Sequence, residues 1–250
     1  MNLKSNPIQI SYAYEKVSEA LGAQIAAGTI LPGDQLPGEV ELAKMFGVNR
    51  STIREAIRSL EGDGFLSRGA GRRLFVSIPG TEKLASRHKR ALGMMKVTFM
   101  ELWHVAHVTE PLAAGLAALN RCEQDIIKLE ENYNQLVELS ANGGVDVWVD
   151  IEFHMLIAEA GNNRALLLAR EPIGLMLYPA YEPVAEAVLQ AAERQIEAHR
   201  HILDAIKQGD EALATKWMRK HIEDFRRGYE VAGLPLDMPL SASTRDLDRK

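Results

Sequence analysis

Four side chains in the second half of the chain have the chemistry of metal ligands: Asp150, His154, His199 and His221. Asp150 and His154 are four residues apart, so on one helix both would point the same way. His199 and His221 belong to later segments and could meet them inside a helical bundle. One carboxylate and three imidazoles suit a divalent transition metal such as zinc, nickel, cobalt or manganese. By itself such a pattern more often belongs to surface or core histidines, so a structural role stays open here.

Two further histidines have ordinary explanations. His201 is two residues past His199 and therefore points elsewhere on the same helix. His88 lies in a stretch rich in lysine and arginine. Neither is a candidate ligand.

A second set of candidate functional residues is basic and lies nearer the N-terminus. Arg50, Arg54 and Arg58 recur every four residues, so they form one stripe on an exposed helix face. The stretch from Asn49 to Arg73 holds six arginines against three acidic residues. An arginine stripe alone is usually a solvated face. A stripe on a turn-linked second helix, followed by a hairpin rich in glycine and arginine, indicates DNA binding.

The elements that must position this stripe are two helices and a β-hairpin. The spacing of apolar residues predicts helices over 39–46 and about 49–62, joined by a tight turn at Gly47. Two short apolar runs, at 65–66 and 74–76, predict the hairpin, or wing. A second helix of this size fits the major groove of duplex DNA.

Residues 12–78 carry a specific pattern of small, apolar and basic residues. It consists of Gly28, Pro32, Gly33, Asp34, Leu36, Pro37, Glu39, Leu42, Ala43, Gly47, Val48, Arg50, Arg54, Glu55, Ala56, Leu60, Gly64 and Gly71. This pattern resembles the winged-helix domain of the GntR family of bacterial transcription regulators. The segment is therefore expected to bind double-stranded DNA.

The resemblance also implies which residues touch the DNA. The expected contacts are Arg50, Ser51, Thr52 and Arg54 in the second helix, Gly71 at the wing tip in the minor groove, and the neighbouring Arg72. One position departs from the family, because many members carry an operator-contacting arginine where this chain has Val40. The operator is therefore expected to differ from the commonest family site.

Beyond residue 80 the elements that must position the candidate metal ligands are helices. Apolar periodicity and the placing of glycine, proline and asparagine predict helices near 82–93, 98–119, 122–141, 145–160, 163–178, 183–207 and 210–230. The stretch from Gly233 to Lys250 is predicted to be a loose tail.

The helical part carries a second family pattern, over about residues 82–230. It consists of Glu110, Pro111, Asp150–His154, Asn162, His199, Arg200, Ile202–Ile206, Gly209, Asp210 and Met218–His221. This pattern resembles the FCD effector domain of the FadR-type branch of the GntR family. The resemblance implies a bundle of six or seven helices whose cavity binds a small organic acid. It also implies metal ligands at Asp150, His154, His199 and His221, with zinc as the first choice and nickel or manganese as alternatives.

Two residues are assigned to the effector on the same resemblance, His107 and Asn162. Many family members carry arginine where this chain has His107, three residues before Glu110, and that arginine points into the cavity. An imidazole would be a weaker or pH-sensitive anchor for an anion, or would hydrogen-bond the effector, or would simply belong to the core.

Three readings of such a metal site stay open. Four protein ligands leave one or two coordination positions that a carboxylate effector could fill, which would make the site a switch. Open positions also serve metal-dependent hydrolases, but Glu152 and Glu159 lie off the face shared by Asp150 and His154, and no His-Glu-x-x-His signature is present. A regulator that senses the metal itself is the third reading. We predict a regulator rather than an enzyme.

Charge and composition fit a regulator of two parts. Residues 1–78 carry nine Lys/Arg and eight Asp/Glu, whereas the rest carries twenty and twenty-six, so the second part is not expected to touch DNA. A single cysteine, Cys122, allows no intramolecular disulfide and fits a reducing cytosol. No secretory signal and no apolar run of membrane-spanning length is evident, so we expect a cytoplasmic protein without a membrane partner.

The sequence therefore predicts a mostly α-helical protein with two domains. Residues 10–78 form a winged helix-turn-helix with a small β wing, 79–231 an all-α antiparallel bundle of six or seven helices, and 232–250 a flexible tail. We expect a homodimer on a short palindromic operator, because one small head makes too few contacts for useful specificity. The predicted function is a transcriptional regulator, a repressor controlled by a small carboxylate effector.

Overall fold

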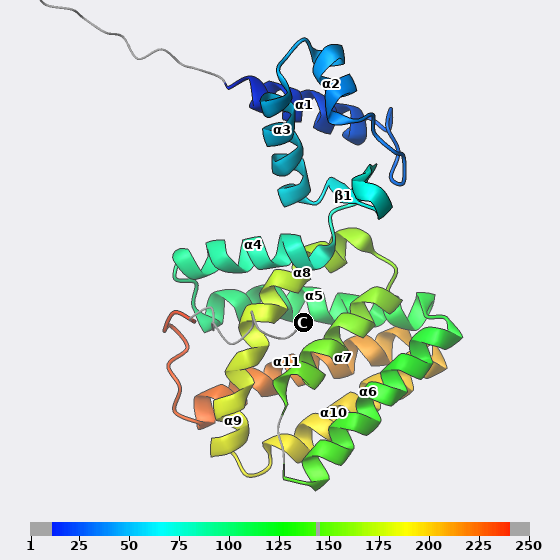
Figure 1. Ribbon diagram of the computed structural model, residues 1–250. Helices are drawn as coiled ribbons and strands as arrows, with labels where there is room; N and C mark the ends of the chain where they lie inside the picture. Colours follow the sequence, from blue (N-terminus) through cyan, green and yellow to red (C-terminus); the bar gives the residue numbers. More distant parts are fainter. Residues whose placement is uncertain (1–11, 144–145, 241–250) are drawn as a thin grey trace, which may run out of the picture. The chain divides into compact units, whose positions relative to one another are not determined.

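The structure, a computed structural model, describes residues 12–143 and 146–240 of the chain. The chain divides into two compact units, Met1–Lys83 and Leu84–Lys250 (Figure 1). The boundary predicted from the sequence, between residues 78 and 79, lies slightly earlier, where the second strand of the wing has ended.

The N-terminal unit consists, in its described residues, of three helices and a hairpin. They are α1 (Ala13–Ala26), α2 (Glu39–Phe46), α3 (Arg50–Asp63), β1 (Leu66–Arg68) and β2 (Leu74–Val76). α1 has no counterpart among the helices predicted above. It packs against α3, where the Ser18 hydroxyl donates a hydrogen bond to the Ala56 carbonyl.

The turn between α2 and α3 fixes where the basic stripe begins. Gly47 ends α2 at a φ of 64°, a left-handed conformation that glycine adopts without steric cost. Asn49 then caps α3, because its side-chain oxygen accepts a hydrogen bond from the Thr52 amide at 2.8 Å. The cap makes Arg50 the first residue of the helix.

The wing is a short antiparallel hairpin that shares the core of this unit. Leu66 pairs with Val76 and Arg68 with Leu74, and a 3-10 turn between the strands carries Gly71 at a φ of 70°. The buried core beneath comprises Val17, Leu21, Leu36, Leu42, Ala43, Ile53, Ala56, Ile57, Leu60, Leu66, Leu74 and Val76. One apolar cluster therefore holds the wing and all three helices together.

The C-terminal unit is helical throughout its described elements. They are α4 (Thr81–Met94), α5 (Phe99–Asn120), α6 (Glu123–Ala141), α7 (Val147–Ala160), α8 (Arg164–Leu177), a 3-10 turn (Tyr178–Tyr181), α9 (Glu182–Ala187), α10 (Ala191–Gln208) and α11 (Glu211–Val231). The predicted fold class, a winged helix-turn-helix followed by an all-helical bundle, is confirmed. None of the described helices is long and apolar enough to cross a membrane.

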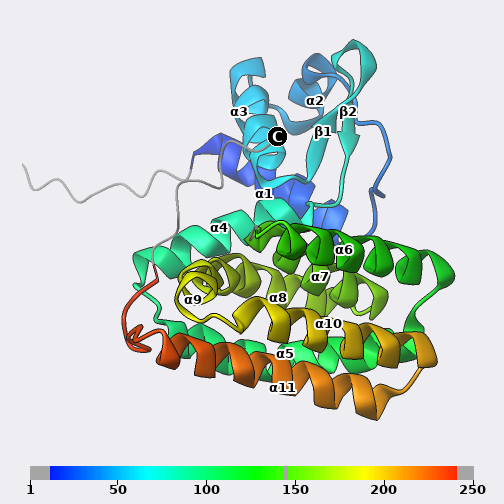
Figure 2. The same cartoon turned by 90° about the horizontal axis from the view of Figure 1, so that it is seen from below.

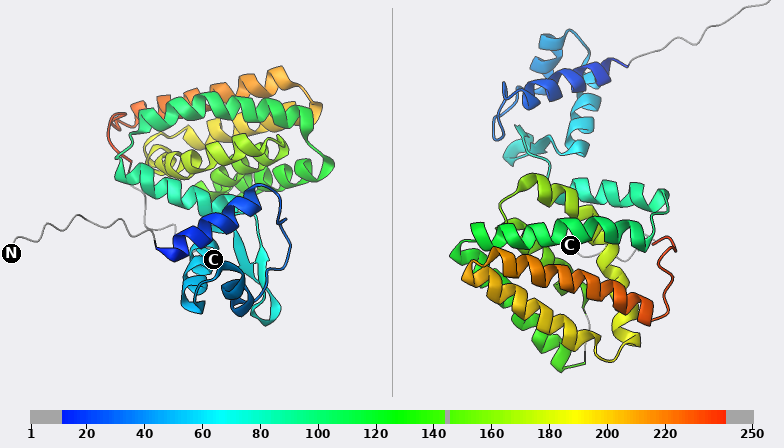
Figure 3. Two further views of the ribbon diagram at one scale, coloured as in Figure 1. Left: turned by 90° about the horizontal axis from the view of Figure 1, so that it is seen from above. Right: turned by 180° about the vertical axis from the view of Figure 1, so that it is seen from behind.

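The bundle places α7 in its interior. α5 and α11 lie side by side and antiparallel, with Phe99 stacked on Tyr229 at a centroid distance of 4.0 Å (Figures 2 and 3). α7 packs against α5, α6 and α8, and α10 packs against α11, α6 and α5. Because α7 is surrounded, its Asp150 and His154 are buried with its apolar side chains. Burial of a charged group demands partners, and the neighbouring helices supply them.

The helix predicted over 183–207 is wrong in one respect, because the chain forms two helices there. α9 ends at Ala187, Val188 is extended at φ −114° and ψ 101°, and α10 begins at Ala191. Val188 packs against the bundle core, and this contact outweighs the local preference for a continuous helix.

The tail predicted from residue 232 needs a similar correction over its first part. Leu234, Leu236 and Leu240 pack against the bundle core. The Met100 amide donates a hydrogen bond to the Leu236 carbonyl, and the Leu240 amide donates one to the Val97 carbonyl. Three leucines at short spacing supply the apolar area that holds this segment on the bundle. Residues 241–250 lie outside the described residues.

Candidate functional site

The four predicted metal ligands come together inside the bundle. Each offers one ligand atom, and these atoms all lie within 4.8 Å of one another. Nε2 of His199 lies 3.2 Å from Oδ1 of Asp150 and 3.3 Å from Nε2 of His221. α7 supplies Asp150 and His154, α10 supplies His199, and α11 supplies His221. Three helices thus converge on one point.

One unpartnered nitrogen atom indicates that these four side chains fit a metal ion. Nε2 of His154 is fully buried and has no hydrogen-bond partner among the described residues. It lies 3.9 Å from Oδ1 of Asp150, on the side of the other ligand atoms. A buried nitrogen without a partner is costly, and a bound cation would satisfy it.

A second layer of buried groups orients His154. Its Nδ1 lies 2.9 Å from Oε2 of Glu110 on α5, and the Tyr178 hydroxyl lies 3.1 Å from the same nitrogen. Arg170 on α8 donates from Nε to the other oxygen of Glu110 at 2.8 Å. A carboxylate on one imidazole nitrogen leaves the lone pair of the other nitrogen facing the cluster, as in many metal sites.

Charge in this region is balanced by neighbouring side chains. Burial raises the pKa of Glu110, but Arg170 and His154 outweigh that effect and bring it down to about 2. Burial likewise raises the pKa of Asp150, and the hydrogen bond from His199 and the nearby imidazoles lower it by more. Gln195 donates a further hydrogen bond to Asp150 at 2.8 Å. Both carboxylates are therefore ionised at neutral pH.

The imidazoles of His199 and His221 are held in their neutral form. Burial lowers the pKa of His199, and burial together with the neighbouring imidazoles lowers that of His221 well below its ordinary value. Neutral imidazoles have the lone pairs that a metal ion requires.

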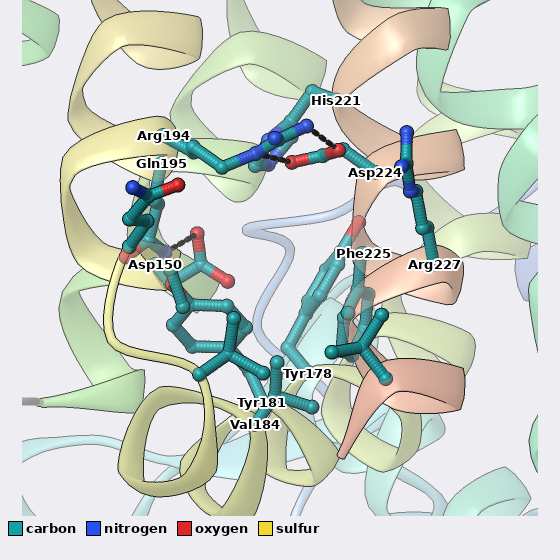
Figure 4. Close-up of a pocket in the computed structure, with 15 residues that line it drawn as sticks. Asp150, Tyr178, Tyr181, Val184, Arg194, Gln195, His221, Asp224, Phe225 and Arg227 are labelled. Carbon is teal, nitrogen blue, oxygen red and sulfur yellow. Dashed lines mark hydrogen bonds and ion pairs between the residues drawn. The ribbon is translucent and has the colours of Figure 1, made fainter. Parts of the chain in front are cut away.

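A cavity of about 200 Å³ opens beside this cluster (Figure 4). Asp150 and His221 form part of its wall, so the cluster borders the space directly. The remaining lining comes from the 3-10 turn and from the stretch between α9 and the end of α11: Tyr178, Tyr181, Val184, Val188, Gln190, Ala191, Arg194, Gln195, Asp224, Phe225, Arg227, Gly228 and Val231. A small molecule in this space would meet the cluster at one end.

The two residues assigned to the effector lie elsewhere in the described structure. His107 stacks on Trp103 at 4.6 Å and donates from Nε2 to Glu223 at 3.0 Å. Asn162 is exposed just after α7, at a φ of 51°. Neither belongs to the lining of the cavity. The structure therefore does not place His107 or Asn162 next to the cavity beside the metal-ligand cluster.

The predicted DNA contacts gather on one side of the N-terminal unit. Arg50, Ser51 and Arg54 are exposed on α3, Thr52 is half-buried, and Gly71 with Arg72 is exposed at the wing tip. A basic groove runs between α3 and the wing and is lined by Glu39, Arg54, Arg58, Glu61, Arg68 and Arg72. A concave basic surface of this kind can bind the phosphate backbone of DNA.

Sequence reasoning missed several residues of both sites. Arg68 ends β1 beside the wing tip, lines the groove and forms an ion pair with Glu61 at 2.8 Å; its charge counts among the six arginines between Asn49 and Arg73, but the sequence-based prediction gives it no DNA contact. Tyr181 and Arg194 line the cavity, and no spacing rule connects them to the metal ligands. Tyr181 and Arg194 can be recognised as cavity residues only when α9 and α10 are known to be separate helices.

Comparison with known proteins decides the family. The model described as "Bacterial regulatory proteins, gntR family" matches residues 13–76, and the FCD domain model matches residues 101–224. The chain belongs to the GntR family. It is a DNA-binding transcriptional regulator of the FadR-type branch, with an FCD domain as its C-terminal unit. The families and relatives that it matches are regulators rather than enzymes.

Individual relatives agree with this assignment. The chain is 27% identical to HTH-type transcriptional regulator LutR of Bacillus subtilis over 82% of this chain and 97% of LutR. It is 25% identical to HTH-type transcriptional repressor NanR of Escherichia coli K12 over 93% and 90% of the two chains. Among solved structures, Streptococcus agalactiae GntR superposes with a TM-score of 0.61 at 25% identity, covering 86% of this chain and 99% of that one.

The buried Arg170–Glu110 pair of this GntR-family regulator generates a stability prediction. Arg170→Met removes the guanidinium and leaves the Glu110 carboxylate with one partner fewer in a dry interior, which we expect to lower the free energy of unfolding by about 3–5 kcal/mol. Urea unfolding measures the loss. Arg194→Met is the matched control, because the Arg194–Asp224 pair is half-exposed and is expected to contribute less than about 1 kcal/mol. Equal losses in the two variants would contradict the role given to Glu110.

Proposed function

We propose that this regulator is a metabolite-responsive repressor that binds a short palindromic operator as a homodimer. A small organic acid bound beside a divalent metal ion in the bundle controls it. The observation that carries the proposal is the buried Asp/His cluster bordering a cavity of small-molecule size. Such a site on the same chain as a DNA-reading head is a sensor. Because its operator is bacterial DNA, the protein would act in the cytoplasm.

The DNA-reading part of the proposal rests on α3 and the wing. Arg50, Ser51, Thr52 and Arg54 occupy the first turns of α3, the part of a recognition helix that faces base edges. The Asn49 cap already uses the Ser51 and Thr52 hydroxyls as hydrogen-bond donors, at 2.7 and 2.8 Å. We therefore assign direct base contacts to the two arginines and phosphate contacts to Arg72 of the wing.

The metal would be held by Asp150, His154, His199 and His221. A bound divalent ion supplies positive charge and open coordination positions for a carboxylate; zinc fits the three imidazoles best, with nickel or manganese as alternatives. The residues around the cluster do the rest: Glu110 and Tyr178 hold the His154 ring, and Gln195 holds the Asp150 carboxylate. An acid anion would not approach ionised Asp150 without a cation between them.

The outer face of α5 supports a dimer through the bundle. Four apolar side chains at helical spacing are exposed there: Val105 (41%), Val108 (67%), Leu112 (50%) and Leu119 (53%). An apolar stripe of this length on a charged bundle is typical of a helix that packs against another copy. We assign the dimer contact to this stripe.

The sense of regulation is proposed from a relative. NanR, which matches most of this chain, is named a repressor. We extend that sense to the present protein: the effector releases the operator. A sensor of the metal itself is the weaker candidate, because the cluster borders a cavity much larger than a metal ion needs.

The DNA assignment is tested with arginine variants of α3. We expect Arg54→Ala and Arg50→Ala each to weaken binding to a duplex selected by the protein from a random pool by about tenfold or more, since a base contact contributes roughly 1–3 kcal/mol. Fluorescence anisotropy at fixed salt measures the affinity. Arg200→Ala, an exposed arginine of the bundle, is the control and should bind normally. Unchanged affinity in both α3 variants would refute the assignment.

The metal assignment is tested with two neighbouring histidines. We expect the parent to bind one equivalent of zinc per chain and His199→Ala to lose most of it. His201→Ala should keep it, because His201 stacks on Trp217 away from the cluster. Elemental analysis gives the metal content, and a chelator should lower the melting temperature of the parent because the ion joins three helices. A parent that takes up no zinc, nickel or manganese would sink the proposal.

The dimer assignment is tested by placing a charge on the stripe. Val108→Glu should shift the full chain from dimer to monomer in sedimentation velocity at micromolar concentration, because a carboxylate would be buried in the interface. Val137→Glu on α6, also partly exposed, should leave the dimer intact. A dimer in both variants would show that the dimer contact does not lie on α5.

A further inference from the structure

The cavity beside the cluster has two chemically different sides. Figure 4 shows His221, Arg194, Asp224 and Arg227 along one side, with Gln195 and Asp150 beside Arg194. Tyr181 and Val184 lie on the opposite side, with Phe225 between. Val188, Ala191 and Val231 add to the apolar lining. A molecule that fills this space therefore needs one charged end and one apolar end.

Two pairs of polar groups in the cavity wall are committed to one another. Arg194 forms a two-point ion pair with Asp224, with Nε 2.7 Å from Oδ2. Gln195 donates to Asp150. Hydroxyl groups on the part of a bound molecule that lies against Val184, Val188 and Phe225 would find few partners there, and each buried hydroxyl without a partner costs about 1–3 kcal/mol. The lining thus disfavours a polyhydroxy acid.

The size of the cavity sets the size of the apolar body. A cavity of about 150 Å³ in another protein accommodates benzene, and this one measures about 200 Å³. The space fits one six-membered ring with a short carboxylate arm. Its width depends on Gly228 of α11, because a Cβ there would lie 2.9 Å from Cγ1 of Val184.

One polar atom of the apolar side remains free. The Tyr181 hydroxyl is buried without a hydrogen-bond partner in the described part of the chain, and its side chain lines the cavity. It can donate to a carboxylate oxygen of a bound acid. His107 lies outside the cavity lining and does not anchor the acid there, so the Tyr181 hydroxyl is one group that can take part in that task.

We propose that the effector is a small carboxylic acid with an apolar body of about the size of one ring, of the phenylacetate class, and not a polyhydroxy acid. This inference rests on the proposed function, since the acid head is placed at the Asp150 and His221 end of the cavity. The ring lies against Val184, Val188 and Phe225, and the Tyr181 hydroxyl donates to the carboxylate.

The test compares two acids on the zinc-loaded full-length protein. Isothermal titration calorimetry with phenylacetate and with glucuronate should show phenylacetate binding at least tenfold tighter. Val188→Asn should weaken phenylacetate at least tenfold, because an amide replaces part of the apolar wall. Leu189→Asn is the matched control. Leu189 follows Val188 directly, but its side chain is fully exposed at 102% and lines no part of the cavity.

Two further variants probe the width and the hydroxyl. Gly228→Val should abolish phenylacetate binding while zinc content and melting temperature stay near those of the parent. If Gly228→Val fails to fold, Tyr181→Phe serves instead, with an expected loss of about five- to tenfold.

The outcomes separate this inference from the proposed function. Tighter binding of glucuronate than of phenylacetate to the zinc-loaded protein, or equal binding in Val188→Asn and Leu189→Asn, would overturn the inference and leave a metal-dependent acid sensor standing. Failure of the parent to hold zinc, with neither acid bound, would overturn both.

Discussion

The ionised carboxylate of Asp150, buried among three imidazoles, is the constraint on which the bundle depends. Asp150 is 4% exposed and lies in the first turn of α7, whose other buried side chains, apart from His154, are apolar. A buried charge without compensation destabilises a protein by several kcal/mol. The bundle compensates it with Gln195 and His199 from α10, and a cation would complete the balance. α10 and α11 must therefore pack against α7 in one register.

The second buried network makes that register specific. Glu110 on α5 connects His154 on α7 with Arg170 on α8, so three helices share one set of hydrogen bonds. Apolar packing alone tolerates small slides between helices, whereas a charged network tolerates none without leaving a group unpaired. Glu110 and Arg170, which do not line the cavity, thus fix the geometry of the ligand cluster. The cavity itself is lined mainly by apolar side chains, which impose fewer geometric constraints than the hydrogen-bonded network. Specificity for a metabolite would arise from these side chains.

Much of this could be predicted from the sequence, for identifiable reasons. Strong periodicity gave the helices that carry Arg50 and Asp150, and glycine and asparagine marked the turn between α2 and α3. The meeting of Asp150 with His199 and His221 followed from chemistry and from resemblance to a family, and the structure does bring these side chains together. Their binding of a metal remains a prediction.

The rest could not be predicted because it depends on long-range packing. Val188 breaks a stretch of good helix formers only because it reaches the core, and that break puts Tyr181 and Arg194 on the cavity. Leu236 and Leu240 hold a segment that local composition marks as loose. Glu223, the hydrogen-bond partner of His107, lies on α11, more than a hundred positions away in the chain, so no local pattern shows this contact.

The most direct test of the central claim is a crystal structure of the zinc-loaded protein with diffraction recorded on both sides of the zinc absorption edge. The account predicts one strong anomalous peak per chain, coordinated by Asp150, His154, His199 and His221 and facing the cavity. No peak at this cluster, or a peak held by other residues, would contradict it.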